Sequence, residues 1–193
     1  AIIDPELTYS VPLSTTLSTG LDALNQSFES IWNKNKTPIS SYLASKAIGN
    51  VMESLPRLIN NIEDFEARYL MAEASLLSGL SISQTFTAIC HSISYPLTLN
   101  YGVEHGVACA FTMVAVAKKV LEKNSDCFQE VIAYNNIHNP QILIENIENL
   151  LELIQVRQKT KEILKTKNNL LAMSNQMITP SRCKNFILDV SNE

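Results

Sequence analysis

Glycine is scarce in this sequence, and its few cysteines form no pattern. Only 5 of the 193 residues are glycine, whereas Leu, Ile, Ala and Ser are abundant, a composition that favours helices over turn-rich sheets. The 4 cysteines are widely separated, without a C-x-x-C pair: Cys90, Cys109, Cys127 and Cys183. Their spacing excludes a zinc ribbon and a small disulfide framework, and it predicts reduced, mostly buried thiols in a cytoplasmic protein.

The chain also lacks a strong charge and a long apolar run. Its formal net charge is only -4, and it has none of the basic clusters that nucleic-acid-binding proteins carry. The most apolar stretch, Gly106 to Ala117, is shorter than the about 20 residues that a membrane-spanning helix needs. Asp4-Pro5-Glu6 interrupts the first apolar residues, so we expect no signal peptide in this sequence. We therefore expect neither a nucleic acid nor a membrane as a partner.

Length and composition are those of one globular domain. A chain of 193 residues with 46% hydrophobic and 18% charged residues can bury a sizeable core. Its two ends nevertheless resemble cut ends. Residues 1–3 are typical of the end of a strand, and residues 189–193 are typical of the start of a helix that does not follow. We expect residues 1–193 to be a single helical domain excised from a longer protein, truncated at both termini.

Apolar residues recur at helical spacing along most of the chain. Between residues 17 and 32 they are spaced by four, three, four and three positions: Leu17, Leu21, Leu24, Phe28 and Ile31. This pattern predicts a helix from Leu17 to Trp32. Similar reasoning predicts four more helices: Thr37 to Leu55, Asp64 to Gly79, Ser83 to Tyr95 closed by Pro96, and Glu104 to Lys123. The more polar remainder is expected to contain shorter helices, within Ser125–Tyr134, Pro140–Lys165 and Ser181–Val190. No strand pattern follows the first few residues, so the predicted fold is an all-α multi-helix bundle.

The segment from residue 90 to 106 holds two of the three histidines, His91 and His105, on either side of a proline and a glycine. Imidazole is the commonest metal ligand in proteins. Asp22 lies far upstream on the first predicted helix. We expect Asp22, His91 and His105 to converge on one divalent metal. Three ligands from separate helices leave an open coordination position, as in catalytic sites, and this donor set suits Zn²⁺ and Fe²⁺ equally.

Simpler interpretations of these residues remain open at this point. An isolated aspartate on a helix is usually solvated or caps a helix, and two histidines near a turn more often pack or form hydrogen bonds than bind a metal. His138 stands in a polar segment before Pro140, and we expect it to be an exposed loop residue without a functional role.

Three segments in register resemble the iron-containing alcohol dehydrogenase family: Asp4–Thr8, Thr19–Leu24 and His91–Gly106. They match its C-terminal helical domain, which is of the dehydroquinate synthase-like fold type, well over residues 1 to 120 and weakly beyond. The resemblance implies that Asp22, His91 and His105 are ligands of Fe²⁺ or Zn²⁺. It also implies that NAD(P)H binds mainly to a missing N-terminal nucleotide-binding domain, from which residues 1–10 lead in. These 193 residues contain no cofactor-binding glycine-rich loop, and alone they are expected to be inactive.

The chain departs from the common family pattern at two positions. Gln26 stands where a fourth ligand histidine is usual, and Tyr95 stands where many relatives have another histidine. Both departures resemble one branch of the family, the phosphonoacetaldehyde reductases, which serve phosphonate metabolism. The resemblance implies a small aldehyde or alcohol substrate, with Gln26 in substrate binding. Tyr95 is then either a catalytic proton donor or a structural hydroxyl packed behind the ligands.

The predicted function is that of the metal-binding helical domain of an NAD(P)H-dependent alcohol dehydrogenase or aldehyde reductase. The metal would polarise the substrate oxygen for hydride transfer, and phosphonoacetaldehyde is the substrate that the branch suggests. Two alternatives stay open: a dehydroquinate-synthase-like metal-dependent lyase domain, and a non-catalytic helical oligomerisation domain. A homo-oligomer is compatible with each of these interpretations.

Overall fold

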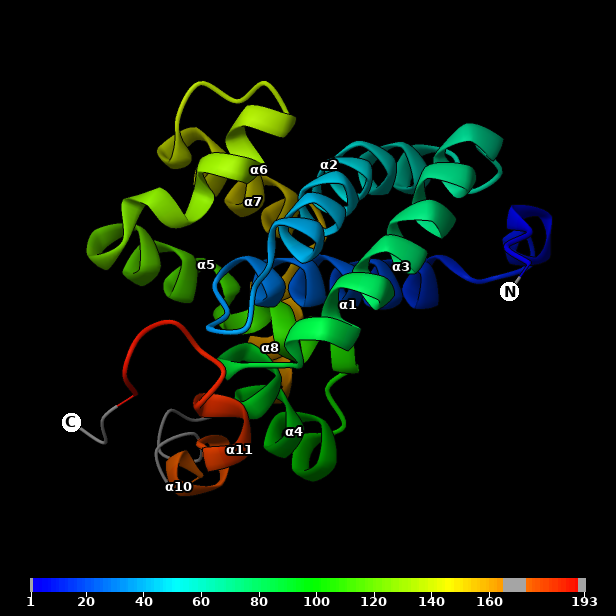
Figure 1. The fold of residues 1–193 in the computed structure, drawn as a ribbon. Helices are drawn as coiled ribbons and strands as arrows, with labels where there is room; N and C mark the ends of the chain where they lie inside the picture. The colour runs from blue at the N-terminus through cyan, green and yellow to red at the C-terminus, as the bar shows by residue number, and fades with distance from the viewer. Residues whose placement is uncertain (1, 165–172, 191–193) are drawn as a thin grey trace.

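Helices make up nearly all the regular structure of the chain (Figure 1). The computed structural model describes residues 2–164 and 173–190. Over these ranges the β-structure consists of one isolated antiparallel bridge, between Asn33 and Phe186. The helical elements are η1 (Pro5–Thr8), α1 (Leu13–Ile31), α2 (Pro38–Asn60), α3 (Phe65–Thr85), α4 (Ile89–Tyr101), α5 (His105–Lys123), η2 (Ser125–Phe128), α6 (Gln129–Tyr134), α7 (Pro140–Leu153), α8 (Val156–Ile163), α10 (Ser174–Met177) and α11 (Pro180–Cys183). The predicted all-α multi-helix bundle is confirmed.

Helix α1 crosses the middle of the molecule and packs against α2, α3, α4 and α5 (Figure 1). Its apolar stripe is excluded from solvent, with Leu21, Leu24 and Phe28 fully buried. Serine, asparagine and glycine residues on its other faces are buried as well. A helix that is buried on most of its faces belongs in the centre of a domain, so α1 is the element against which the others are positioned.

Two helix starts lie within one residue of the predicted ones, and each is capped by a side chain. Thr37 accepts a hydrogen bond from the backbone N–H of Ser40 at 3.1 Å, and Pro38 occupies the first turn of α2. Asp64 caps α3 in the same way, by accepting from the N–H of Ala67 at 3.0 Å. Both caps satisfy donors that the first turn of a helix leaves free, so these two boundaries are readable from the sequence.

Three predicted helix ends and one predicted start are wrong. Helix α2 continues past Leu55 and through Pro56 to Asn60. Helix α3 continues through Gly79 to Thr85, because a glycine inside a helix costs only about 1 kcal/mol and tertiary packing outweighs it. Helix α4 begins at Ile89 rather than Ser83, and it continues past Pro96 to Tyr101. Pro96 removes one backbone N–H from the helix, while it and Leu97 are buried against the core. The end of α4 is Gly102, in the left-handed conformation with φ of 67°.

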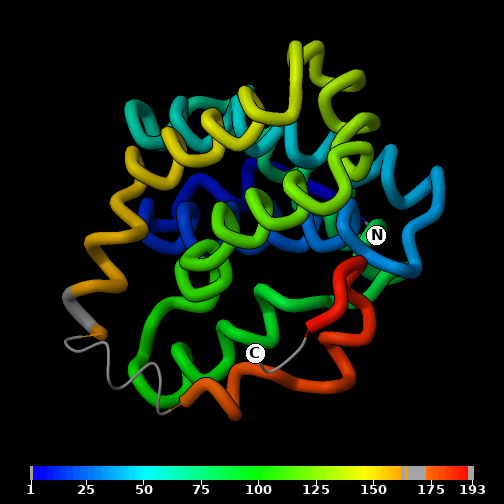
Figure 2. Tube along the Cα trace, turned by 90° about the vertical axis from the view of Figure 1, so that its left-hand side faces the viewer, coloured from blue at the N-terminus to red at the C-terminus, as the bar shows by residue number. Residues whose placement is uncertain are grey.

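The C-terminal part is less helical than predicted, but it is packed against the bundle. Within the predicted segment Pro140–Lys165, whose last residue lies outside the described residues, two helices, α7 and α8, are separated at Gln155, which has a positive φ of 61°. In Ser181–Val190 the helix covers only the single turn of α11. Nevertheless α10 and α11 contact α4, as the orange and red segment beside the green helix in Figure 2 illustrates. The hydroxyl of Ser92 donates to the Met177 carbonyl at 2.6 Å and ties this segment to α4.

Several expectations concern the ends and the cysteines. Residues 2 and 3 belong to no strand, whereas residue 1 and residues 191–193 of the predicted helix start lie outside the described residues. All four cysteines are free thiols, and three of them are buried: Cys90, Cys109 and Cys127. In the described part of the chain, none of the helices has both the length and the apolar character needed to cross a bilayer.

Candidate metal centre

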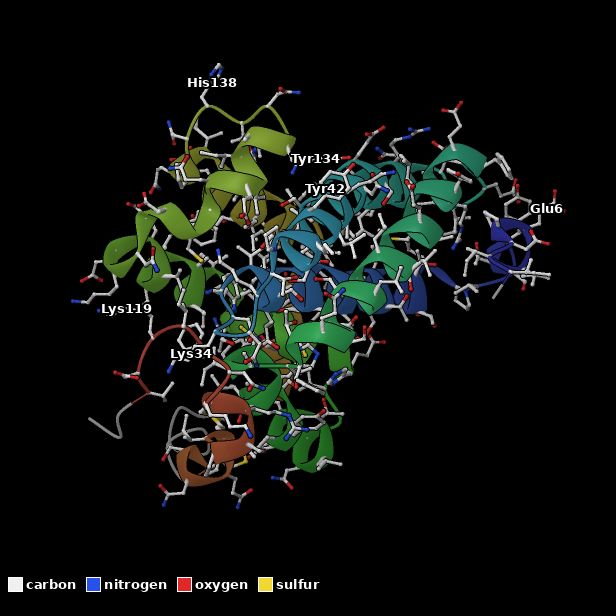
Figure 3. The ribbon with its side chains drawn as sticks, viewed as in Figure 1. Glu6, Lys34, Tyr42, Lys119, Tyr134 and His138 are labelled. Carbon is white, nitrogen blue, oxygen red and sulfur yellow. The ribbon has the colours of Figure 1, made fainter. Side chains whose placement is uncertain are left out.

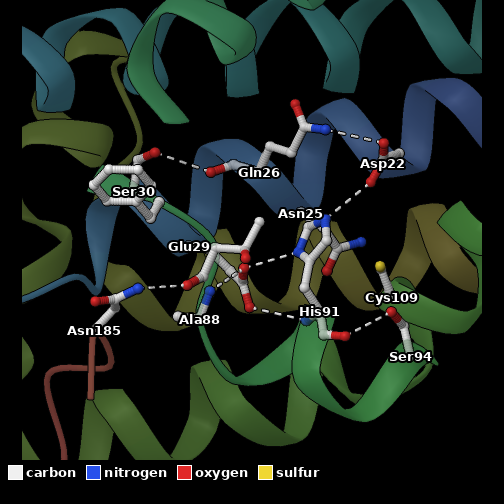
Figure 4. Close-up of polar contacts among 12 residues, drawn as sticks. Asp22, Asn25, Gln26, Glu29, Ser30, Ala88, His91, Ser94, Cys109 and Asn185 are labelled. Atoms are coloured by element: carbon white, nitrogen blue, oxygen red, sulfur yellow. Dashed lines mark hydrogen bonds and ion pairs between the residues drawn. The ribbon is translucent and has the colours of Figure 1, made fainter. Parts of the chain in front are cut away.

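Helices α1, α4 and α5 bring the three predicted ligands together. Figure 4 shows Asp22 and His91 of this set, together with Cys109. Asp22 comes from the middle of α1, His91 from the first turn of α4, and His105 is the first residue of α5. Asp22 Oδ1 lies 3.2 Å from His91 Nε2 and 3.7 Å from His105 Nε2. The Cys109 sulfur joins them, and one ligand atom of each of the four residues lies within 4.8 Å of all the others.

A glycine makes the meeting of α1 and α5 possible. A Cβ on Gly106 would lie 1.7 Å from the Ser18 carbonyl oxygen of α1 and 3.0 Å from the Asp22 nitrogen. No side chain fits at such a distance from backbone atoms, so α5 can begin directly against α1 only with glycine here. Because His105 directly precedes Gly106, its backbone lies where α5 meets α1, and its imidazole reaches to 3.7 Å from Asp22 Oδ1.

The buried carboxylate of Glu29 positions His91. Glu29 lies two turns after Asp22 on α1 and is fully excluded from solvent. Its oxygens accept from the N–H groups of Ala88 at 2.6 Å and His91 at 3.1 Å, which open α4. Glu29 Oε2 also lies 2.8 Å from His91 Nδ1. One carboxylate therefore caps the start of α4 and fixes the orientation of the imidazole, leaving Nε2 directed at Asp22.

The connection between α3 and α4 is held by asparagines. Three side-chain amides donate to three consecutive carbonyls: Asn35 to Thr85, Asn33 to Phe86 and Asn185 to Thr87. The middle residue of this connection has a backbone φ of 63° and ψ of 166°, a region in which non-glycine residues are strained. The three amides offset that strain, and they fix where α4 starts and therefore where His91 stands.

Charge around the cluster is unevenly distributed. Burial disfavours the charged imidazolium of His91, but its hydrogen bonds to Asp22, Cys109 and Glu29 outweigh burial and raise its pKa to about 12. Burial likewise raises the pKa of the Cys109 thiol, yet hydrogen bonds to His105 and His91 lower it overall. Two carboxylates and an acidified thiol around two imidazoles form an anion-rich centre, which suits a divalent cation.

The chemistry of this donor set fits a metal such as Zn²⁺ or Fe²⁺. If a metal binds Nε2, the proton of His91 stays on Nδ1, and the Nδ1–H group donates a hydrogen bond to Glu29. This arrangement is usual for metal-bound histidines. His91 is 3% exposed, whereas the side chains of Asp22 and His105 are 26% and 37% exposed. The cluster is therefore closed toward the core and open toward the surface, so a small ligand can approach from that side.

Gln26 and Tyr95, the other two predicted site residues, lie next to the cluster. The Gln26 amide nitrogen donates to Asp22 Oδ2 at 3.0 Å, and its oxygen accepts from the Ser78 hydroxyl at 3.3 Å. The ring of Tyr95 lies 5.7 Å from that of His105, and the guanidinium of Arg182 lies 4.4 Å above it. Gln26 therefore holds Asp22 by a hydrogen bond, while the ring of Tyr95 is near both the predicted ligand His105 and the guanidinium of Arg182.

Sequence reasoning missed Glu29 and Cys109. A signal for Glu29 was present, because Asp22 and Glu29 are the only charged residues of α1 and are seven positions apart, on one face. Cys109 lies four positions after His105, one helical turn. The exposure predicted for the third histidine is confirmed. His138 lies in the connection between α6 and α7, at the top of the view in Figure 3.

A family match and two individual relatives of this chain all point to the same protein family. The model of the C-terminal part of the Fe-containing alcohol dehydrogenase family matches residues 16–183. The chain is 34% identical to the NAD-dependent methanol dehydrogenase of Bacillus methanolicus over 127 residues, which are 62% of this chain and 33% of that protein. It is 38% identical to the phosphonoacetaldehyde reductase of Streptomyces viridochromogenes over 114 residues, 58% of this chain and 29% of that one. The chain thus spans about a third of the length of the curated relatives that it matches.

A solved structure extends the likeness over nearly the whole chain. The sulfoacetaldehyde reductase of Bifidobacterium kashiwanohense, solved in complex with NAD⁺, superposes with a TM-score of 0.85 at 28% sequence identity. The match covers 97% of this chain and 50% of that one. The helices described above therefore have the arrangement of one half of that reductase.

Proposed function

The chain belongs to the Fe-containing alcohol dehydrogenase family, and on that premise we propose that it is the metal-binding helical part of an NAD(P)H-dependent alcohol dehydrogenase or aldehyde reductase. One observation carries the proposal. Asp22, His91 and His105, from three different helices, have ligand atoms within 4.8 Å of one another. Chance packing rarely brings a carboxylate and two imidazoles together at the open end of a supported cluster.

The residues around the cluster divide the work of catalysis. Asp22, His91 and His105 would hold a divalent metal, which would supply Lewis-acid polarisation of a substrate oxygen. Glu29 keeps the His91 ring oriented, and Gln26 holds Asp22 Oδ2 so that Oδ1 faces the histidines. Tyr95 stands beside His105 on the same side, and its hydroxyl is our candidate for delivering a proton to the nascent alkoxide.

The hydride donor would come from outside these 193 residues. No glycine-rich phosphate-binding sequence occurs in them, and the solved reductase with NAD⁺ is twice as long as the part that matches. We propose that NAD(P)H binds mainly to a nucleotide-binding domain preceding this one, and that the active site lies between the two domains. Residues 1–10 would then be the segment that leads in from that domain.

A small aldehyde with an anionic group is the substrate class that we propose, phosphonoacetaldehyde being the first compound to test. Two of the compared proteins are named for acetaldehydes with a phosphonate or sulfonate group. The guanidinium of Arg182 over the Tyr95 ring provides a positive charge beside the ligand set. Arginine matches such oxyanions by charge and by its planar donors. Gln26 adds an amide near the same cluster and is our second candidate for substrate contact.

Metal analysis tests the site. Chelator-treated protein, reloaded with Fe²⁺ or Zn²⁺, is expected to bind about one equivalent, and His91→Ala or His105→Ala is expected to abolish this binding. His138→Ala is the matched control, because this exposed histidine should leave the stoichiometry unchanged. Normal metal binding by both ligand variants would contradict the assignment and favour a non-catalytic helical module.

Turnover tests the reaction. The longer protein, with its nucleotide domain, should oxidise NAD(P)H with phosphonoacetaldehyde more efficiently than with a neutral aldehyde of similar size. The 193 residues alone should not oxidise NAD(P)H with any aldehyde. Redox turnover by these residues alone would contradict the division of labour. A longer protein that binds the metal but turns over no aldehyde would instead favour the alternative of a metal-dependent lyase.

A further inference from the structure

Cys109 is a fourth candidate ligand on the same cluster. It lies on α5 one turn after His105, is fully buried, and its sulfur is drawn beside His91 in Figure 4. The sulfur is 3.7 Å from His105 Nε2 and interacts with His91 as well. It is one of the four ligand atoms that all lie within 4.8 Å of one another.

Three distances among the four ligand atoms are close to those of tetrahedral coordination. Zinc bonds of about 2.0 Å to nitrogen and oxygen and about 2.3 Å to sulfur place neighbouring ligand atoms about 3.3–3.5 Å apart. Asp22 Oδ1 and His91 Nε2 are 3.2 Å apart, and His105 Nε2 is 3.7 Å from Asp22 Oδ1 and also from the Cys109 sulfur. Each of these three distances is within a few tenths of an ångström of a tetrahedral edge.

The side-chain amide of Gln26 is not positioned to be the fourth metal ligand. Gln26 turns its amide nitrogen, a donor, toward Asp22, while its oxygen accepts from Ser78. The buried thiol of Cys127, by contrast, donates to the Ile31 carbonyl at 3.4 Å, outside the cluster. The thiol of Cys109 therefore combines burial, direction and distance in a way that these two groups do not.

We propose that Cys109 binds the metal as a thiolate, so that the protein ligand set is Asp22, His91, His105 and Cys109. The inference rests on the proposed function, because it requires a metal at that site. When the sulfur–metal bond forms, the thiol proton leaves to solvent and no redox change occurs. A thiolate is a soft ligand that selects Zn²⁺ over harder cations such as Mg²⁺ and Mn²⁺, and with four protein ligands a substrate oxygen enters as a fifth.

Cobalt substitution tests this ligand set. The metal-free chain titrated with Co²⁺ should develop both the visible bands of a tetrahedral site and a near-ultraviolet sulfur-to-cobalt charge-transfer band. Cys109→Ser should lose the charge-transfer band and bind Co²⁺ and Zn²⁺ about 10–100-fold more weakly. Losing a residue that only supports a ligand already weakens metal affinity by this factor, so losing a ligand should weaken it at least as much. Cys127→Ser is the matched control, since it changes another buried thiol and should keep the band.

The outcomes separate this inference from the proposed function. One equivalent of Co²⁺ without a charge-transfer band, or a band that survives in Cys109→Ser, overturns the role of Cys109 while the metal site stands. A folded chain that binds no Co²⁺ overturns both. If Cys109→Ser does not fold, X-ray absorption of the zinc-loaded unmodified chain decides: a sulfur neighbour at about 2.3 Å supports the proposal, and nitrogen and oxygen neighbours alone overturn it.

Discussion

His91 has a carboxylate at each ring nitrogen, and the two carboxylates act differently. Asp22 lies at Nε2 and is partly exposed, whereas Glu29 lies at Nδ1 and is fully buried. A metal ion can replace the proton between Asp22 and Nε2, but it has no route to the other side of the ring. Glu29 therefore holds the orientation of His91 whether or not a metal is bound, and its burial is tolerated because three donors surround it.

Replacing Glu29 should separate support of a ligand from ligation itself. In Glu29→Gln the amide keeps the size of the side chain but presents a donor to the N–H groups of Ala88 and His91. We expect the free energy of unfolding to fall by about 3 kcal/mol and metal affinity to weaken by about 10–100-fold. Denaturant unfolding and a Zn²⁺ titration measure the two effects. Glu130→Gln, at an exposed carboxylate, should change neither, and an unaffected Glu29→Gln would contradict the role of Glu29.

At the scale of single residues, the sequence indicated the groups with distinctive chemistry. Asp22, His91 and His105 stand out because few residue types bind metals, and the structure places them together. Their function as ligands stays a prediction. Glu29 and Cys109 were missed, since a glutamate or a cysteine inside a helix gives no sign of which other helix it faces. That information lies in the crossing of α1 with α4 and α5.

Among the contacts between helices, the crossing of α1 and α5 would be disturbed by one added side-chain carbon at Gly106. Gly106→Ala would put a Cβ against the Ser18 carbonyl, so α5 must move away from α1 and carry His105 from Asp22. We expect a loss of stability of about 1–3 kcal/mol together with weaker metal binding. Gly79→Ala is the matched control, because a Cβ there has open space within 4 Å. That substitution should stabilise α3 by about 0.5–1 kcal/mol, as measured by denaturant unfolding.

If Gly106→Ala were as stable as the unmodified chain and bound metal normally, the close approach of the two helices would not govern the site. A loss of metal binding without any loss of stability would mean instead that the crossing adjusts and only the ligand geometry changes.

The starts of α2 and α3 were predicted more accurately than the ends of α2, α3 and α4, for a physical reason. A start needs local groups to satisfy free N–H donors, and Thr37 and Asp64 supply them within three residues. An end depends on whether the next turn still finds a partner. Gly79 and Pro96 lower helix stability locally, but α3 and α4 continue because their later turns pack against the bundle. Such long-range packing cannot be read from the neighbouring sequence.

For the whole molecule, the candidate centre joins helices that the chain connects only through long intervening segments. Asp22 and His91 are separated by 69 positions, and α2 and α3 lie between them. A metal held by α1, α4 and α5 would therefore bind the folded chain far better than the unfolded one. Binding that is selective for the folded state adds to its stability by mass action.

Metal removal should consequently lower the melting temperature. At Zn²⁺ 100-fold above the dissociation constant, the gain is about 2.7 kcal/mol, which for a chain of this size corresponds to about 5–10 °C. Differential scanning calorimetry of the chelated and the reloaded chain measures the shift. His105→Ala, whose side chain is partly exposed, should fold yet show almost no shift. Equal melting temperatures with and without metal, or an undiminished shift in His105→Ala, would mean that the three helices do not share an ion.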